Sequence, residues 1–380
     1  MGDAAENPAI RKKKETIPAY LGLLSGCRSV NNYKRLNRVQ EGTYGVVFRA
    51  QDIVTKEIVA LKKVKMDRET EGFPITSLRE ISILLTFKHP NIVDVKEVVV
   101  GSKTDSIFIV MEFVDHDLKD LMKDMKPDTR FLASEVKCLM IQLLSAMAHL
   151  HENWIIHRDL KTSNLLYNNR GILKVADFGL AREYGSPLKG YTPTVVTLWY
   201  RAPELLLGEV EPVPTFFNSR EGTKLYTPAI DMWSVGCIFA ELITKEALMQ
   251  GRSEIDQLDR MCRLLGPPNE QTWPGMKDLP LAKSFNFSRK LEGDLRQKMG
   301  SQITENGYRL LSSLLAWDPE QRPTAAEALA HPYFTESPAK KVEFMPTWPS
   351  AHDGSSRKRG REDAIDEAAL QKKLASVMKR

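Results

Sequence analysis

His157-Arg158-Asp159-Leu160-Lys161-Thr162-Ser163-Asn164 is the stretch of sequence that decides the fold. Asp159 can accept the proton of an attacking hydroxyl, Lys161 can neutralise charge on a phosphate, and Asn164 can hold Mg²⁺ through its amide oxygen. Each of these residues alone would more often be a solvated loop residue. Chance rarely places all of them at this spacing, so the stretch predicts a catalytic loop.

A second acidic motif, Asp177-Phe178-Gly179, follows this loop after two short apolar runs over 165–167 and 172–175. The runs predict a hairpin that turns through residues 168–171. Asp177 supplies a hard carboxylate oxygen, which suits a Mg²⁺ ion that bridges phosphates. Phe178 is expected to pack into the core. Ala202-Pro203-Glu204 closes the segment that begins at Asp177.

A lysine lies inside an apolar run upstream, in Val59-Ala60-Leu61-Lys62. An ammonium group in such a strand needs an anionic partner, because an unpaired buried charge is costly. A single strand lysine is more often exposed. Glu80, on the next predicted helix, favours a paired Lys62 over an exposed one. A Lys62–Glu80 pair could hold the α- and β-phosphates of ATP.

A glycine-containing turn, Gly42-Thr43-Tyr44-Gly45, lies between two predicted strands. Glycines at such a turn let backbone N–H groups approach phosphate oxygens without a side chain in the way. A plain glycine hairpin is an equally open interpretation of the turn alone. Gln40 stands where the first glycine of G-x-G-x-x-G would be.

The order of predicted elements indicates an α+β, bilobal fold. Runs of β-forming residues predict strands over 33–40, 45–51, 57–65, 93–101 and 106–113. A helix begins at Pro74 and stops at His89-Pro90. Apolar residues at helical spacing predict helices over 134–151, 229–243, 254–265, 306–316 and 325–330.

Composition excludes several classes of protein. The 380 residues, 42% of them hydrophobic, suffice for one large two-lobed domain. No stretch approaches the ~20 apolar residues of a membrane span, and residues 1–16 lack the apolar core of a secretory signal. The four cysteines form no C-x-x-C pair, which argues against a disulfide framework or a zinc site. Because the net charge of +5 comes largely from residues 354–380, a direct nucleic-acid-binding fold is not expected.

Together these motifs resemble the eukaryotic protein kinases over residues 33–334. Lys161, two residues after Asp159, is similar to the serine/threonine form of their catalytic loop. Pro74-Ile75-Thr76-Ser77-Leu78-Arg79-Glu80 reads PITSLRE and resembles one branch of the cyclin-dependent kinases. The flanks Gly26-Cys27-Arg28-Ser29-Val30 and Phe344-Met345-Pro346-Thr347-Trp348-Pro349 are similar to that branch as well.

The resemblance implies roles for further residues, with ATP and Mg²⁺ as cofactors. It places Gln40, Gly42 and Gly45 around the phosphates, and Thr197 beside Asp159 as a brace. The adenine would lie between Val47, Ala60 and Leu166, with Met111 as gatekeeper, the backbone of Glu112 and Val114 along the adenine edge, and Asp117 at the ribose. A pocket for a substrate proline would be formed by Val195, Val196 and Arg201, so that Ser/Thr-Pro sequences are the expected substrates.

The resemblance also implies regulation by a cyclin and by phosphorylation. A cyclin, expected to be of the L type, would dock on the 74–80 helix and move Glu80 into place. A phosphate on Thr192 carries about −2 charge and needs basic partners. The sequence offers Arg79, Arg158 and Arg182. Thr43 and Tyr44 match inhibitory phosphosites, although a loop-capping role is equally open for Tyr44.

The expected organisation is a flexible segment over 1–32, a kinase domain over 33–334 and a C-terminal extension over 335–380. The small lobe would span 33–113 and the large lobe 114–334, with a surface insertion at about 209–225. The cluster Arg357-Lys358-Arg359-Gly360-Arg361 suits a nuclear localisation signal, with solvated charge as the open alternative. Nuclear, and secondarily cytoplasmic, roles in transcription, pre-mRNA splicing and the cell cycle are implied by the resemblance.

The alternative function is a pseudokinase-like scaffold that binds a cyclin and RNA-processing partners without catalysis. Such a protein would be expected to lack Lys62, Asp159, Asn164 or Asp177. All four are present, and Gln40 is the deviation from the pattern.

Overall fold

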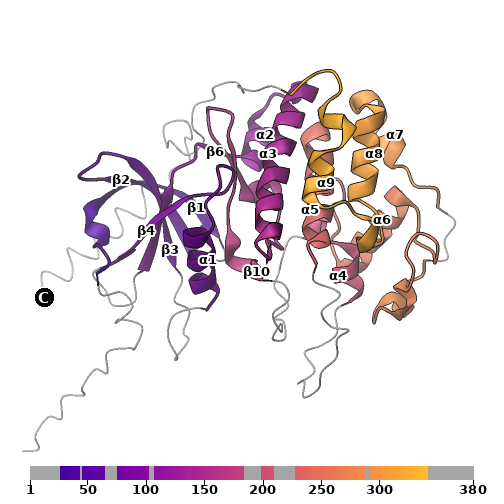
Figure 1. The fold of residues 1–380 in the computed structure, drawn as a ribbon, viewed down its shortest axis with the longest axis horizontal. Helices are drawn as coiled ribbons and strands as arrows, with labels where there is room; N and C mark the ends of the chain where they lie inside the picture. The colour runs from indigo at the N-terminus through magenta and orange to yellow at the C-terminus, as the bar shows by residue number, and fades with distance from the viewer. Residues whose placement is uncertain are drawn as a thin grey trace, which may run out of the picture.

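The computed structural model describes residues 26–42, 45–64, 75–101, 107–183, 198–208, 227–287 and 291–340. The side chains of residues 40–42, 75–80 and 182–183 lie outside this description. A β-rich lobe and a helical lobe lie side by side (Figure 1). The expected α+β, bilobal arrangement is confirmed.

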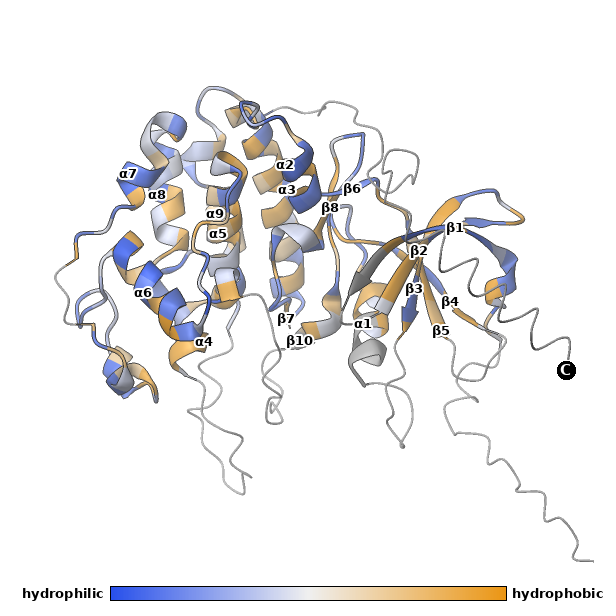
Figure 2. Cartoon of the chain, turned by 180° about the vertical axis from the view of Figure 1, so that it is seen from behind, coloured by the Kyte–Doolittle hydropathy of each residue, from blue (hydrophilic) through white to orange (hydrophobic). Residues whose placement is uncertain are grey.

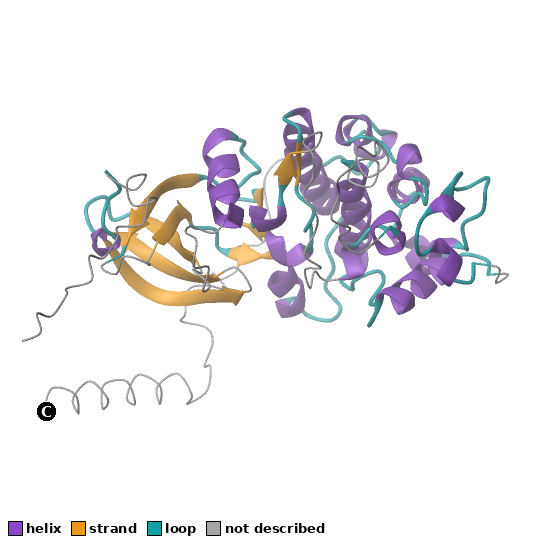
Figure 3. Ribbon diagram, turned by 90° about the horizontal axis from the view of Figure 1, so that it is seen from below, coloured by secondary structure: helices purple, strands orange, loops and turns teal. Residues whose placement is uncertain are grey.

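The small lobe is an antiparallel sheet with one helix, α1, against it. Among the described residues the strand order is β1-β2-β3-β5-β4, and the view from below separates this sheet from the helices of the other lobe (Figure 3). The bounds are β1 Tyr33–Gly42, β2 Gly45–Asp52, β3 Ile58–Val64, α1 Ile75–Thr86, β4 Val95–Val100 and β5 Ile107–Glu112.

Side chains along β3 alternate between the two faces of this sheet, and the two faces carry different kinds of residue. Val59 and Leu61 are buried in a compact cluster with Ala50, Phe108 and Val110 on one face. Successive side chains point to opposite faces, so Ala60 and Lys62 share the other face.

The large lobe is built around two central helices, α3 and α5. Residues 230–243 of α5 are all buried, as expected for a helix that is apolar nearly all round, and orange segments mark the apolar interior of this lobe (Figure 2). The helices are α2 Leu118–Asp124, α3 Ala133–Glu152, α4 Pro203–Leu207, α5 Ala229–Thr244, α6 Glu254–Leu265, α7 Leu295–Met299, α8 Glu305–Leu314 and α9 Ala325–Leu329. The short strands are β6 His116–Asp117, β7 Ile155–Ile156, β8 Leu165–Tyr167, β9 Leu173–Val175 and β10 Arg182–Glu183.

The loop between α1 and β4 fastens the small lobe to the large one. Val93 N donates to Val175 O at 3.0 Å, and Val175 N donates to Asn91 O at 2.8 Å. The Asn91 amide also donates to Leu173 O at 2.9 Å and to the Gln142 side chain at 2.8 Å. This loop is therefore hydrogen-bonded to α3 and β9 of the large lobe.

Residues 26–32 differ from the expected flexible segment, because they pack on the small lobe. Ser29 forms a parallel bridge with Val100, and Val30 is buried with the sheet cluster. Arg28 donates to Asp52 Oδ2 at 3.2 Å and to Glu97 Oε1 at 3.1 Å. The packed part of the small lobe thus begins before residue 33. The reason is that one apolar side chain and one charged side chain find partners that lie far along the chain.

No helix within the described ranges is long and apolar enough to cross a membrane.

Candidate active site

One face of the small-lobe sheet collects the residues expected around a nucleotide. Val47 is directly opposite Lys62 in the β2–β3 register, and Ala60 is directly opposite Met111 in the β3–β5 register. Directly paired residues point to the same face of a sheet. Val47, Ala60, Lys62 and Met111 therefore lie together, as the resemblance implied.

Gly45 begins β2 at a position where only glycine fits. Its φ is +150°, and a Cβ there would lie 2.1 Å from the carbonyl oxygen of Lys63. Gly42 and Gly45 are register partners, so they bring the two strands together at the turn. Gln40 stands where the first glycine would be and is paired through its backbone with Val47, directly after a shift in the β1–β2 register between Arg38 and Gln40.

Lys62 reaches across to Asp177, which joins the two lobes at the centre of the site. Their Nζ and Oδ1 atoms are 3.1 Å apart. Burial alone would raise the pKa of the Asp177 carboxyl. The charge and hydrogen bond of Lys62, with His157 and Lys161 nearby, outweigh burial and hold this pKa below its usual range. Asp177 is thus kept ionised beside a fixed cation.

Asp159, Lys161 and Asn164 converge as the loop motif predicted. Lys161 Nζ donates to Asp159 Oδ2 at 2.7 Å. Asn164 Nδ2 donates to the Asp159 backbone carbonyl at 2.8 Å and to Asp159 Oδ2 at 3.2 Å. These bonds turn the amide nitrogen of Asn164 toward Asp159, so the amide oxygen is directed away from it.

The donor set fits a hard divalent cation. The Asn164 amide oxygen and the Asp177 carboxylate are oxygen ligands of the kind that Mg²⁺ prefers. Asp177 also adopts a left-handed backbone, with φ 64° and ψ 71°. Such conformations in non-glycine residues concentrate at functional sites, because the surrounding structure must hold them there.

A fully buried acid in α5, Asp231, holds the catalytic loop in shape. It accepts hydrogen bonds from His157 N and Arg158 N, each at 2.8 Å, and its Oδ2 lies 3.0 Å from His151 Nε2. Burial raises its pKa, but these donors outweigh burial and lower it overall. The two amide bonds also hold Arg158 at φ 71°. Sequence reasoning missed Asp231, although a carboxylate within an apolar helix needs buried donors and could have signalled it.

The connection between the lobes carries the residues expected at the adenine and ribose. Val114 is buried, and Asp117 is paired with Leu166 across the β6–β8 register. The Glu112 carboxylate accepts from Asp94 N at 2.7 Å and lies 2.6 Å from Lys174 Nζ. This ties the end of β5 to the large lobe and fixes the backbone that would face the adenine.

Burial raises the pKa of the Asp117 carboxyl to about 6, although its bond from Asp120 N acts in the opposite direction.

Arg201, expected at the proline pocket, donates to Glu254 Oε1 at 2.8 Å and is thereby held against α6. Arg158 donates to Leu180 O at 3.4 Å, which places it against the motif that begins at Asp177.

Several expected site residues lie outside the described part, so their roles stay predictions. These are Thr43, Tyr44, Thr192, Val195, Val196 and Thr197, the side chains of Gln40, Gly42, Arg79, Glu80 and Arg182, and the insertion at about 209–225. The expected Lys62–Glu80 pair belongs with them.

Comparisons with known proteins agree with this geometry. Residues 33–334 match the protein kinase domain family. The chain is 52% identical to Cyclin-dependent kinase 11B of Mus musculus over 368 residues, which are 96% of this chain and 45% of that protein. It is 54% identical to Cyclin-dependent kinase 11 of Dictyostelium discoideum over 342 residues, 90% of this chain and 91% of that protein. It is 57% identical to Cyclin-dependent kinase G-2 of Oryza sativa subsp. indica over 341 residues, 88% of this chain and 46% of that protein.

The chain spans about half the length of the mouse and rice relatives. Its match to the kinase domain, by contrast, extends over both lobes and includes the residues that converge on Asp159 and Asp177. The chain therefore belongs to the protein kinase family and, within it, to the cyclin-dependent kinases of the PITSLRE type.

Proposed function

We propose that this chain transfers the γ-phosphate of ATP to serine and threonine hydroxyls of proteins, with Mg²⁺ as the metal. The observation that carries the proposal is the Lys62–Asp177 contact of 3.1 Å, which lies above a catalytic loop in which Asp159, Lys161 and Asn164 are hydrogen-bonded together. A protein that had abandoned catalysis would have no need to keep these charged groups in one partly buried place.

The residues of the chain divide the work of the reaction. When bound, ATP and its metal supply the phosphoryl group and neutralise part of its charge. Asp159 orients the substrate hydroxyl and accepts its proton at a carboxylate oxygen. Lys161, 2.7 Å from that carboxylate, adds positive charge where negative charge develops. Lys62 would bind phosphate oxygens, while Asp177 and Asn164 would hold the metal.

Substrate choice and activation are inferred from the family. The substrates would carry proline after the phosphorylated residue, with the side chain of Arg201, held by Glu254, at the edge of the proline pocket. An L-type cyclin would dock on the 74–80 helix. A phosphate on Thr192 would gather Arg79, Arg158 and Arg182, so Thr192→Ala should lower cyclin-stimulated activity. Full activity of that variant would contradict this mode of activation.

Phosphate transfer from labelled ATP to a Ser-Pro peptide, with and without an L-type cyclin, tests the proposal. Transfer should require the cyclin, disappear in Asp177→Asn, and persist in Asp259→Asn, which alters a half-buried acid of α6 that is paired with Arg263. An otherwise identical Ser-Ala peptide should be a poor substrate, and equal rates would contradict the proline preference. Absence of transfer with ATP still bound would favour a nucleotide-binding scaffold.

We also propose that the chain works in the nucleus, secondarily in the cytoplasm, in transcription, pre-mRNA splicing and the cell cycle. The basic cluster Arg357-Lys358-Arg359-Gly360-Arg361 supports the nuclear location. Deletion of residues 357–380 from a fluorescently tagged chain should reduce nuclear accumulation. An unchanged distribution would indicate that the cluster is solvated charge.

A further inference from the structure

A buried cluster of three oxygen-bearing side chains lies beneath the catalytic loop. Thr162 Oγ1 donates to Glu241 Oε1 at 3.0 Å, and Tyr200 Oη donates to Glu241 Oε2 at 2.6 Å. The two hydroxyl oxygens are 3.2 Å apart. The exposed fractions of Thr162, Tyr200 and Glu241 are 0%, 6% and 4%. One carboxylate is thus held by one hydroxyl on each of its oxygens.

Each of the two hydroxyls donates its hydrogen bond to one carboxylate oxygen of Glu241. Burial, followed by the neighbouring Glu241 charge, raises the pKa of the Tyr200 hydroxyl, so this group keeps its proton and donates. The threonine hydroxyl is likewise a donor to a carboxylate. A buried carboxylate that lost either donor would be costly, because no water would replace the bond. Burial raises the pKa of the Glu241 carboxyl, and the bonds from Tyr200 and Thr162 act in the opposite direction, so the two hydroxyls favour its ionised form.

The three members come from elements with different tasks. Thr162 lies between Lys161 and Asn164, in the short turn 162–164 that supports the catalytic residues. Tyr200 belongs to the segment 198–202, next to Arg201 of the expected proline pocket. Glu241 lies in the buried helix α5. The cluster is thus a direct link between the groups that carry the chemistry and the segment expected to hold the peptide.

The segment that contains Tyr200 is fixed firmly on its other side. Ser234 Oγ donates to Tyr200 O at 2.9 Å, and Trp199 Nε1 donates to Gly251 O at 3.1 Å. Arg201 is bound to Glu254. Because α5 and α6 hold this segment in place, its link to Thr162 can fix the position of the catalytic loop relative to it.

We propose that Thr162 is a positioning residue for phosphoryl transfer, which acts by holding the catalytic loop at a fixed distance from the peptide-binding segment through Glu241 and Tyr200. The inference rests on the kinase function proposed above. The hydroxyl of Thr162 touches neither reactant. Loss of this hydroxyl lets the catalytic loop shift relative to the peptide. Small displacements of reacting groups lower the reaction rate strongly.

The test compares Thr162→Val, which removes the hydroxyl at nearly constant volume, with Thr162→Ser, which keeps it. In the cyclin complex, Thr162→Val should lower kcat/KM for the peptide by about tenfold or more, while KM for ATP stays within about twofold. Thr162→Ser should restore most of the loss. Thr244→Val removes a hydroxyl whose hydrogen-bond partners in the described part are backbone groups, the carbonyls of Ala240 and Glu246 and the amide of Glu246, and it should leave both constants near those of the unmodified chain.

A double-mutant cycle with Tyr200→Phe should show strong non-additivity, because both hydroxyls serve one carboxylate. Hydrogen exchange provides a readout independent of activity: in Thr162→Val the amides of residues 162–165 and 198–202 should exchange faster. If the unmodified chain transfers no phosphate, the proposed function fails, whereas exchange still tests the link. Unchanged exchange, or a Thr162→Val enzyme with lower thermal stability but unchanged kinetic constants, would overturn the inference.

Discussion

At the residue scale, Asp117 caps a helix and also lies at the expected ribose position. Its carboxylate caps the start of α2 by accepting from Asp120 N at 2.8 Å, and its register with Leu166 places it where a ribose is expected. Burial raises its pKa to about 6. An ionised carboxylate accepts hydrogen bonds from ribose hydroxyls, whereas a protonated one has given up part of that capacity.

We therefore predict that kcat/KM for ATP rises with pH through an inflection at about 6. Below this pKa Asp117 is protonated, and above it the carboxylate is available, so activity is lost as the pH falls. The quantity kcat/KM is the right one to measure, because it reports groups of the free enzyme. In Asp117→Asn the inflection should disappear. Its survival in that variant would assign it to another group.

The residues that the structure brings together around Asp159 and Asp177 could be predicted because each belongs to a short motif with fixed spacing. Lys62, Asp159, Asn164 and Asp177 signal themselves through local neighbours. Asp231 could not be assigned its task in this way, because its donors lie about 75 residues upstream and their approach depends on how α5 packs. Thr162 stands at one of the unspecified positions of the H-R-D-x-x-x-x-N motif, so the motif predicts no role for it.

At the element scale, α4 is held to the region before α9 by a buried ion pair. Arg322 Nη1 donates to Glu204 Oε1 at 2.6 Å, and Nη2 donates to Oε2 at 2.8 Å. The Arg322 side chain is also bonded to the carbonyls of Ala316, Trp317 and Ala229. Because both charges are satisfied inside the protein, removing one leaves the other buried and unpaired.

We predict that Glu204→Ala lowers the free energy of unfolding by roughly 3–5 kcal/mol. The pair of exposed Arg263 with half-buried Asp259 provides the control, and Arg263→Ala should cost less than about 1 kcal/mol. Urea denaturation followed by tryptophan fluorescence measures both variants. Equal losses in the two would show that burial does not set the strength of these pairs.

Sequence patterns predicted the long elements and some short ones, such as α9 and β8, but not α2 and α4. The helix expected over 254–265 is observed as Glu254–Leu265, and the strand expected over 45–51 as Gly45–Asp52. α2 and α4 span seven and five residues, too few turns for an apolar face to repeat. They form because Asp117 caps one of them and because the other is fixed through Glu204.

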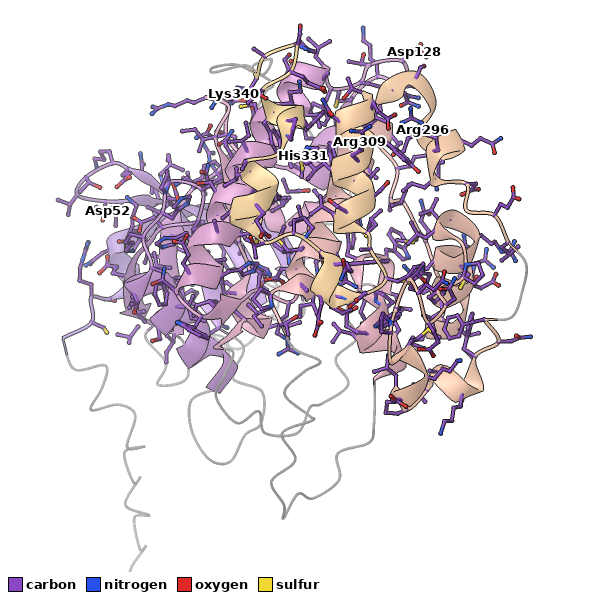
Figure 4. The ribbon with its side chains drawn as sticks, turned by 45° about the vertical axis from the view of Figure 1, so that its right-hand side comes forward. Asp52, Asp128, Arg296, Arg309, His331 and Lys340 are labelled. Atoms are coloured by element: carbon purple, nitrogen blue, oxygen red, sulfur yellow. The ribbon has the colours of Figure 1, made fainter. Side chains whose placement is uncertain are left out.

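At the scale of the whole molecule, the packed domain extends beyond residues 33–334 at both ends. Residues 26–32 attach to the small lobe through Arg28 and Val30. At the other end, the fully buried Lys137 of α3 donates to Glu336 O and Pro338 O, each at 2.8 Å. Asp52, the partner of Arg28, is labelled on the small lobe, and Lys340, the last described residue, on the helical lobe (Figure 4).

A chain that begins at Gly26 keeps both Arg28 and Val30, so it is the reference for a truncation test of this attachment. A chain that begins at Tyr33 loses the burial of Val30 and the Arg28 contacts, and its melting temperature should fall by about 3–6 °C. Differential scanning calorimetry of both chains checks this. Identical melting temperatures would show that residues 26–32 rest on the lobe without stabilising it.

The left-handed backbones of Arg158 and Asp177 have a consequence for any library of variants. Glycine adopts φ near +65° without steric cost, whereas these two side chains are held there against a penalty of about 1–2 kcal/mol. A score of cellular abundance should therefore tolerate glycine at Arg158 better than at Asp177, where it removes the carboxylate that pairs with Lys62, while a score of growth dependent on the enzyme should reject glycine at both positions. Positions where glycine is tolerated in the abundance score but rejected in the growth score would mark, without any ligand, where the chain has given up stability for its chemistry.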